Sequence, residues 1–205
     1  MEQKIIFATG NQNKMREIHM ILDAPGLRIL SMKEAGIIAD ITEDGTSFQE
    51  NAAIKAKAVH EFAPEAIVLA DDSGLVIDAL NGEPGIYSAR YMGEDTSYDI
   101  KNSNLLERMQ GVPEEERTAR FVCAVAAALP DGRVLTCEGT MEGTIAHKIA
   151  GENGFGYDPI FWLPECHQTS AEISPEKKNE LSHRGKALRA MRELLNKVLF
   201  EENQR

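Results

Sequence analysis

An apolar run that ends in two adjacent carboxylates constrains this chain more than any other feature of its sequence. Residues 67–75 read IVLADDSGL, so Asp71, Asp72 and Ser73 directly follow four apolar residues. Such a run predicts a buried strand that delivers these side chains to a sheet edge, where charges are costly unless they are paired or metal-bound. A turn in which Asp71 caps nearby backbone is the alternative. We favour a functional role for Asp72, because three other polar, glycine-containing segments suit the same site.

Composition limits the number of domains and the kind of partner. The chain has 205 residues, of which 42% are hydrophobic and 27% charged, so we expect one domain, which could have two lobes. Its 22 basic and 33 acidic residues give a net charge of -11, which opposes nucleic-acid binding along a phosphate backbone. A small anionic ligand would need a local basic pocket and a divalent cation.

Cysteine usage and hydropathy predict the compartment. The three cysteines lack C-x-x-C spacing, which argues against a disulfide framework or a zinc site and fits a reducing compartment. The longest apolar run, residues 121–129, is far shorter than the roughly 20 residues of a membrane helix. We therefore expect a soluble, cytoplasmic protein without membrane contact.

Local patterns predict alternating strands and helices. Residues 4–8 predict a strand, followed by a glycine turn and a helix with Met15, Ile18 and Leu22 on one face. A capping box at Ser47 starts a second helix. Further expectations are a helix over 97–109, a hairpin formed by 118–129 and 133–137, a structured loop over 151–161, and a final helix that starts at Ser182.

The first glycine turn could bind an anion. Thr9 to Lys14 read TGNQNK, and their backbone N–H groups and the dipole of the following helix favour a negatively charged ligand. Lys14 could add the point charge that phosphates need. A plain capping turn with an exposed lysine is an equal alternative on this segment alone. No Walker P-loop pattern occurs.

Acidic residues offer oxygen ligands for magnesium. Asp71, Asp72 and the pair Glu43-Asp44 suit Mg²⁺, which usually takes one or two carboxylates together with substrate phosphates and water. For Glu43-Asp44, spacing alone favours a solvated loop ahead of the Ser47 cap.

Two later segments suit a planar ligand. The loop FGYDPIF places an aromatic ring beside a glycine and an Asp-Pro turn, so Phe155 could stack on a ring, whereas Tyr157 fits better as core. Lys178, His183 and Arg184 gather donors near a helix start. Cations oppose the helix dipole there, which a ligand would compensate.

Taken in order, the motifs resemble the inosine triphosphate pyrophosphatase family, also described as dITP/XTP pyrophosphatases that remove non-standard purine nucleotides. The resemblance spans residues 8–188 and is carried by TGN with its following lysine and glutamate, LADDSGL, NGEPGIYSARY, GENGFGYDPIF and LSHRGKAL. It implies an α/β fold: an elongated mixed sheet flanked by helices, with two lobes and a nucleotide cleft between them. It also implies a homodimer, and that residues 1–205 form a single two-lobed nucleoside triphosphate pyrophosphatase domain.

The resemblance also implies residue roles. Asp72 is similar to the general base that holds Mg²⁺, and Ser73 to the next substrate contact; Glu43 matches a metal ligand only loosely. Lys178 matches a substrate lysine, although Lys177 could share that role. The triphosphate loop corresponds to Thr9, Gly10, Asn11, Gln12, Asn13 and Lys14, the base-binding loop to Phe155, Gly156, Tyr157 and Asp158, and the base-reading pair to His183 and Arg184.

The implied reaction converts ITP, dITP or XTP to the monophosphate and pyrophosphate. Asp72 would deprotonate a water that attacks the α-phosphorus. His183 or Arg184 would donate to the 6-oxo group of the base, which adenine lacks; how guanine is rejected does not follow. The competing hypotheses are a related pyrophosphatase acting on modified pyrimidines or standard nucleotides, and a nucleotide sensor without turnover.

Overall fold

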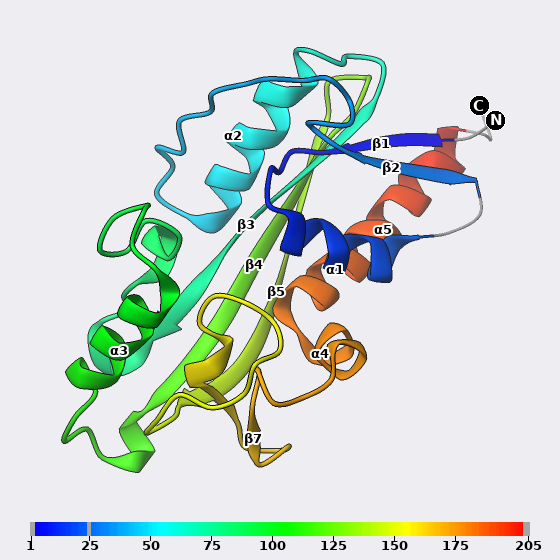
Figure 1. Cartoon of the computed structure of the whole chain (residues 1–205). Coiled ribbons are helices and arrows are strands. Elements are labelled where there is room, and N and C mark those ends of the chain that lie inside the picture. Colours follow the sequence, from blue (N-terminus) through cyan, green and yellow to red (C-terminus); the bar gives the residue numbers. More distant parts are fainter. Residues whose placement is uncertain (1–2, 24–25, 203–205) are drawn as a thin grey trace. The chain divides into compact units, whose positions relative to one another are not determined.

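The computed structural model describes residues 3–23 and 26–202, and within them the chain forms one mixed seven-stranded sheet with helices (Figure 1). The strand order is β2-β1-β3-β4-β5-β6-β7. β1 pairs in parallel with β2 and β3, whereas β5–β6 and β6–β7 are antiparallel. The α/β class and the mixed sheet are therefore confirmed. The strands are β1 (Gln3–Phe7), β2 (Leu27–Ser31), β3 (Ile67–Ile77), β4 (Thr118–Ala128), β5 (Val134–Ile145), β6 (Phe161–Leu163) and β7 (Gln168–Thr169).

The helices begin where the sequence provides caps. Asn11 caps α1 (Gln12–Leu22) with its side-chain oxygen, and Ser47 caps α2 (Phe48–His60) by accepting from Glu50 N–H. The other helices are α3 (Tyr98–Arg108), α4 (Pro175–Leu181) and α5 (His183–Glu202).

Tertiary contacts divide the chain into two compact units. The first unit contains the residues up to Asp72, Cys123–Gly139, and the residues from His183 onward. The second contains Ser73–Val122 and Thr140–Ser182. The expected single domain and its nucleotide cleft stay predictions.

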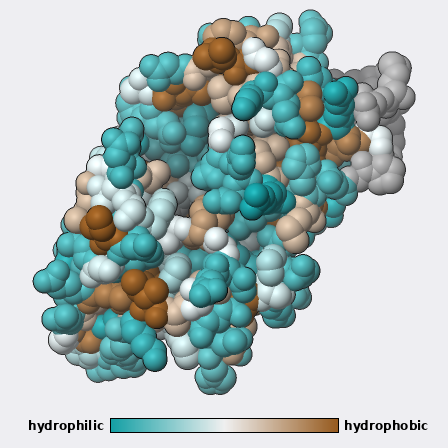
Figure 2. Space-filling view, in the orientation of Figure 1, coloured by the Kyte–Doolittle hydropathy of each residue, from teal (hydrophilic) through white to brown (hydrophobic). Residues whose placement is uncertain are grey.

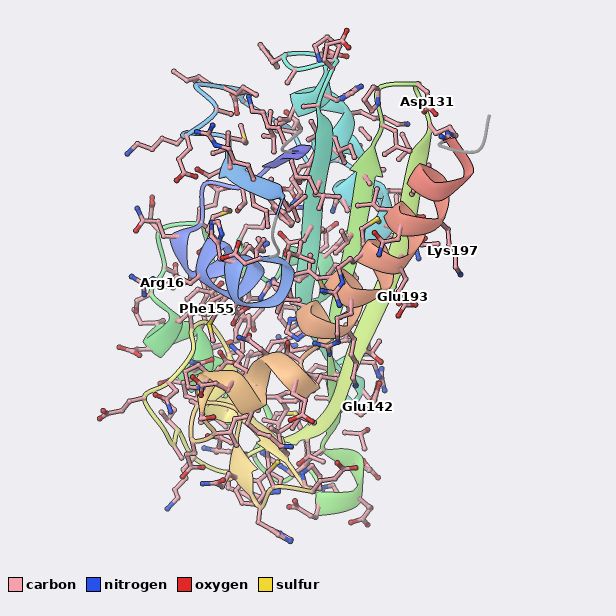
Figure 3. All side chains as sticks on the ribbon, turned by 90° about the vertical axis from the view of Figure 1, so that its right-hand side faces the viewer. Arg16, Asp131, Glu142, Phe155, Glu193 and Lys197 are labelled. Carbon is pink, nitrogen blue, oxygen red and sulfur yellow. The ribbon has the colours of Figure 1, made fainter. Side chains whose placement is uncertain are left out.

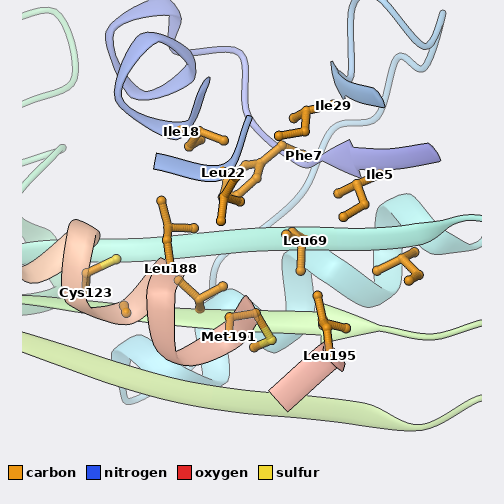
Figure 4. Packing of buried hydrophobic residues seen from close by; sticks show 14 of the residues in the cluster. Ile5, Phe7, Ile18, Leu22, Ile29, Leu69, Cys123, Leu188, Met191 and Leu195 are labelled. Atoms are coloured by element: carbon orange, nitrogen blue, oxygen red, sulfur yellow. The ribbon is translucent and has the colours of Figure 1, made fainter. Parts of the chain in front are cut away.

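In the first unit, helices cover both faces of the sheet. α1 and α5 lie on one face, where Ile18, Leu22 and Leu188 pack against β1, β3 and β4 (Figure 4). α2 lies on the opposite face (Figure 1), where Ala52, Ala56 and other small side chains meet Val68 and Ala70 of β3. β3 is thus buried on both sides, as its continuous apolar run predicts.

The second unit has its own core. Leu105 of α3 and Met109, the residue that follows this helix, pack with side chains from β3, β4 and β5 and from the segment around η4 (Asp158–Ile160). The expected loop over 151–161 is irregular up to η4, and β6 starts at its last residue.

Two strands extend well past the ends that the sequence predicts. β3 runs on to Ile77, so Asp71 and Asp72 lie within the strand and not at its end. Its neighbour β1 ends at this level instead, because β1 stops at Phe7, opposite Leu69 of β3. β5 extends to Ile145, well past the expected Cys137. The sequence patterns predict neither β2 nor α4.

The molecular surface in one view is largely polar. The face seen in Figure 2 is mostly hydrophilic, with small separate hydrophobic areas. Among the described residues, no helix is long and apolar enough to span a membrane.

Candidate active site

Asp71 and Asp72 point to opposite faces of the sheet. Successive side chains of a strand alternate between faces. Leu69, two residues before Asp71, packs in the core beneath α1 and α5, whereas Ala70, two residues before Asp72, packs beneath α2. The two neighbouring carboxylates therefore meet different helices and different partners.

Asp71 is fully buried and binds two cationic side chains. Its side chain is 0% exposed, and both of its oxygens lie 3.0 Å from Nζ of Lys14. Arg184 Nε donates to Oδ2 at 3.2 Å, and the same guanidinium donates to Glu17. Lys14, Glu17, Asp71 and Arg184 form a network that joins α1, β3 and α5, which we call the Asp71 network.

Electrostatics favour the ionised form of Asp71. Burial raises its pKa, but the charges of Lys14, Arg184 and Lys55 outweigh burial and hold the pKa well below the usual value. A carboxylate with both oxygens already bonded to cations is poorly placed to bind a metal. Asp71 is therefore a partner for the two cations and not a candidate metal ligand.

Asp72 has a different environment. Asn51 Nδ2 donates to Asp72 Oδ2 at 3.0 Å, and Lys55 Nζ lies 3.8 Å from Oδ1. Lys55 also binds Glu43 Oε2 at 3.0 Å. Burial raises the pKa of Asp72, and Lys55 and Asn51 only partly counteract this effect. A carboxylate with a raised pKa is a better proton acceptor near neutral pH.

The Asp72 environment fits a magnesium ion. The carboxylates of Asp72 and Glu43 both lie near one cation, the ammonium of Lys55. The negative charge of Glu43 also raises the pKa of Asp72. Two carboxylates match the number that Mg²⁺ usually takes from a protein. In the part of the chain that the structure describes, no group of three or more His, Cys, Asp or Glu side chains gathers. Substrate phosphates and water would have to complete the coordination.

The glycine turn is partly self-capped. Asn11 Oδ1 accepts from the backbone N–H groups of Asn13 and Lys14, and Asn11 N–H donates to Thr9 Oγ1. Asn11 therefore caps the helix as the capping alternative predicts. The exposed lysine of that alternative is wrong, because the Lys14 side chain is 17% exposed and bound to Asp71. A cavity of about 840 Å³ adjoins this turn, lined by Thr9, Gly10, Gln12, Met15, Arg16, His19, Met20, Ser31, Lys33 and Glu34.

In the second unit, Asp158 organises the loop around Phe155. Its Oδ2 accepts from Phe155 N–H at 2.8 Å and from Lys178 Nζ at 2.6 Å, and its Oδ1 accepts from Ser170 Oγ at 2.9 Å. Gly154 is required here, because it has φ +75° and an added Cβ would lie 2.2 Å from Asp158 Oδ2. Asp158 is 2% exposed and shapes the loop from inside.

Phe155 is the loop residue that suits ring stacking. It is half-buried, and Lys178 Nζ lies 4.9 Å from its ring centroid (Phe155 is labelled in Figure 3). Tyr157, in contrast, is 3% exposed, donates from its hydroxyl to Ser88 O at 2.7 Å and packs edge-on against Tyr98. Asn102 Nδ2 donates to Gly156 O at 3.1 Å. Tyr157 and Asn102 therefore support the loop from within.

The expected site residues fall into two groups. Thr9–Lys14, Glu43, Asp72, His183 and Arg184 belong to the first unit; Ser73, Phe155–Asp158 and Lys178 belong to the second. Sequence reasoning missed Asn51, Lys55, Glu17 and Ser170 as partners. A signal existed for two of them, because Asn51 and Lys55 are polar residues spaced i, i+4 on α2 beside its apolar stripe.

A carboxylate with a raised pKa beside a second carboxylate and a lysine suits the hydrolysis of a phosphoric anhydride. The family model described as "Ham1 family" matches residues 5–194. The chain therefore belongs to the Ham1 family.

Relatives cover almost the whole chain. The dITP/XTP pyrophosphatase of Desulforamulus reducens is 47% identical over 97% of this chain and 98% of its own length. That of Clostridium perfringens is 43% identical over 96% and 99%. The solved structure of the Staphylococcus aureus Ham1 protein is 39% identical, has a TM-score of 0.85 and covers 96% of this chain and 100% of that chain.

Proposed function

We propose that this protein hydrolyses non-standard purine nucleoside triphosphates, namely ITP, dITP and XTP, to the monophosphate and pyrophosphate, and so cleanses the nucleotide pool. The observation that carries the proposal is that two adjacent carboxylates have different partners and different pKa shifts. Asp71 is neutralised by Lys14 and Arg184, whereas Asp72 has a raised pKa beside Glu43 and Lys55. The names of the relatives from Desulforamulus and Clostridium support the substrate class.

The triphosphate binds, in this proposal, at the turn formed by Thr9–Lys14. Lys14 supplies positive charge there, and Asp71 holds its ammonium in place. Asp72 orients and deprotonates the water that attacks the α-phosphorus, and pyrophosphate leaves. Ser73, the next residue of β3, contacts the same substrate.

Mg²⁺ would be held by Asp72, with Glu43 as the second ligand. When bound, the ion would neutralise phosphate charge and help to orient the leaving pyrophosphate. Lys55 keeps the two carboxylates together, because its ammonium lies 3.0 Å from Glu43 Oε2 and 3.8 Å from Asp72 Oδ1.

The base is bound, in this proposal, by the loop Phe155–Asp158. Phe155 stacks on the purine, and Lys178 is fixed beside the ring by Asp158. His183 and Arg184 donate to the 6-oxo group. Arg184 is already anchored through Asp71 and Glu17, which fixes the guanidinium without further ordering.

The decisive experiment is hydrolysis of ITP in ¹⁸O-labelled water, followed by phosphorus NMR. Attack at the α-phosphorus should place the label in the monophosphate and leave pyrophosphate unlabelled. Parallel rates for ITP, XTP, dITP, GTP and ATP should rank the first three highest, and removal of Mg²⁺ by a chelator should stop turnover.

Other outcomes of this experiment select other functions. Label in pyrophosphate or orthophosphate contradicts attack at the α-phosphorus. Equal rates with ATP indicate an enzyme for standard nucleotides. Tight nucleotide binding without any product, with or without Mg²⁺, indicates a sensor.

The stacking role of Phe155 can be tested separately. Phe155→Ala should raise KM for ITP about 5- to 150-fold, because stacking of a base on an aromatic ring contributes about 1–3 kcal/mol. Phe155→Tyr keeps the ring and should change KM little. Steady-state kinetics decides; an unchanged KM in Phe155→Ala means that the ring does not stack on the base.

Three further properties form part of the proposal. Residues 1–205 act as a single two-lobed domain, the protein is a homodimer, and it works in the cytoplasm, where the nucleotide pool lies. All three cysteines are free thiols, which a reducing compartment maintains. Sedimentation analysis of the purified protein tests the dimer.

A further inference from the structure

Asn51 is a fully buried polar side chain beside Asp72, and the sequence motifs assign it no role. It is 0% exposed, although it lies on α2 among alanines that form the core. Burying an amide is costly unless both its donor and its acceptor are satisfied. The partners of Asn51 therefore indicate why an amide is placed here.

The two ends of the Asn51 amide face two segments of the site. Nδ2 donates to Asp72 Oδ2 at 3.0 Å, and Oδ1 accepts from the backbone N–H of Gly45 at 2.9 Å. A carboxylate can only accept and a backbone N–H can only donate, so this orientation of the amide is the one that satisfies both. Aspartate or leucine at position 51 could not replace both bonds.

Gly45 is shaped to receive this amide. An added Cβ at Gly45 would lie 2.7 Å from Asn51 Oδ1 and 2.8 Å from Glu50 Cβ, closer than real Cβ atoms approach. Gly45 also lies two residues after Glu43. Glu43 is bound to Lys55, which lies one helical turn after Asn51 on α2. One face of α2 thus fixes both carboxylates, Asp72 through Asn51 and Glu43 through Lys55.

We propose that Asn51 is a positioning residue: it fixes the rotation of the Asp72 carboxylate and ties it to the Glu43 segment through Gly45. The inference rests on the proposed function, because it concerns the same general base. A carboxylate that rotates freely would present its reacting oxygen to water and metal only part of the time. Outer partners of this kind typically contribute about 10- to 100-fold to activity.

The test compares Asn51→Leu with Gly45→Ala, which disturb the same bond pair from opposite sides. Asn51→Leu should lower kcat for ITP about 10- to 100-fold. KM, and the affinity for ITP measured by calorimetry without metal, should stay within about twofold. Gly45→Ala should lower kcat in the same direction. The double variant should fall no further than Asn51→Leu, because neighbours that act through one contact are not additive.

Controls separate positioning from folding. Gln49→Leu removes an exposed amide from the same helix and should leave kcat unchanged. Thermal melts accompany every variant, and metal-free ITP binding reports whether the site is still formed. The inference is overturned if Asn51→Leu keeps kcat within about twofold of wild type, if metal-free binding falls as much as kcat, or if the double variant shows the product of the single losses.

Failure of the proposed function looks different. In that case the wild-type protein itself releases no pyrophosphate from ITP, or Asp72→Asn remains active. If wild type is active and Asp72→Asn is not, an unchanged Asn51→Leu refutes the positioning role alone.

Discussion

Replacing Asp72 with asparagine should reduce kcat for ITP hydrolysis by about 10²- to 10⁴-fold, the usual contribution of a positioned general base. The substitution keeps the size of the side chain. The new amide can turn its oxygen toward Nδ2 of Asn51, so the contact with α2 survives. The variant loses the proton acceptor. It also loses the negative charge that lies beside Glu43 and faces the ammonium of Lys55.

Kinetics and binding should separate in this variant. Nucleotide affinity measured by calorimetry should remain, because Lys14 and the Thr9–Lys14 turn are untouched. Asp71→Asn, at the neighbouring position, is the informative comparison. It removes the negative partner of Lys14 and Arg184, so nucleotide affinity and stability should decrease together with turnover. Activity of Asp72→Asn within tenfold of wild type would remove Asp72 from the role of base.

Local sequence signals predicted most of the elements. The Ser47 capping box, the apolar stripe of α1 and the hairpin between β4 and β5 are each contained in a short stretch of chain. Signals of this range are readable because a cap or a turn depends on neighbours in sequence. The predicted end of β3 was wrong, because the end of a strand does not depend on sequence neighbours alone. Polar residues suggested a strand end, but the strand continues through Leu75 and Ile77, and its neighbour β1 stops instead.

The division between Asp71 and Asp72 could not be predicted from sequence. Alternation along a strand places them on opposite faces. Which face holds cations depends on partners far away, since Arg184 is 113 residues from Asp71 and Lys14 is 57 residues from it. The sequence therefore grouped the two carboxylates as magnesium ligands, whereas the structure assigns Asp71 to an internal ion-pair network.

The same limit applies to the loop around Phe155. Its aromatic and Asp-Pro pattern indicated a structured loop, and the structure has one. The buried bonds of Asp158 to Lys178 and Ser170 link segments 20 and 12 residues away, so the sequence could not distinguish a ligand contact from a residue that builds the loop. The geometry makes Asp158 a loop-building residue and leaves Phe155 as the ring placed for stacking.

Arg184→Ala should destabilise the protein by about 3–5 kcal/mol, the usual cost of removing one partner of a buried ion pair. The Arg184 side chain is 3% exposed, and its loss leaves Glu17 without this cation and Asp71 with Lys14 alone on that face of the sheet. For a chain of this length, about 2–4 °C of melting temperature per kcal/mol gives a decrease of roughly 6–20 °C.

Arg120→Ala is the matched control for this experiment. Arg120 also binds two carboxylates, those of Asp78 and Glu142, but its side chain is 32% exposed. Each exposed ion pair contributes about 0–1 kcal/mol, so the loss of both pairs should lower the melting temperature by no more than about 8 °C. Equal shifts in the two variants would contradict a special role for the Asp71 network.

Substrate preference then decides whether Arg184 also reads the base. At a temperature where Arg184→Ala is folded, kcat/KM for ITP should fall about 10- to 150-fold more than kcat/KM for ATP, because a hydrogen bond to a charged donor contributes about 1.5–3 kcal/mol. Arg184→Lys keeps a positive charge near Asp71 but loses the planar fork, so it should recover stability better than selectivity. An equal fall for ITP and ATP in both variants would limit Arg184 to holding Asp71 and Glu17, and base selection would then rest on Phe155 and Lys178.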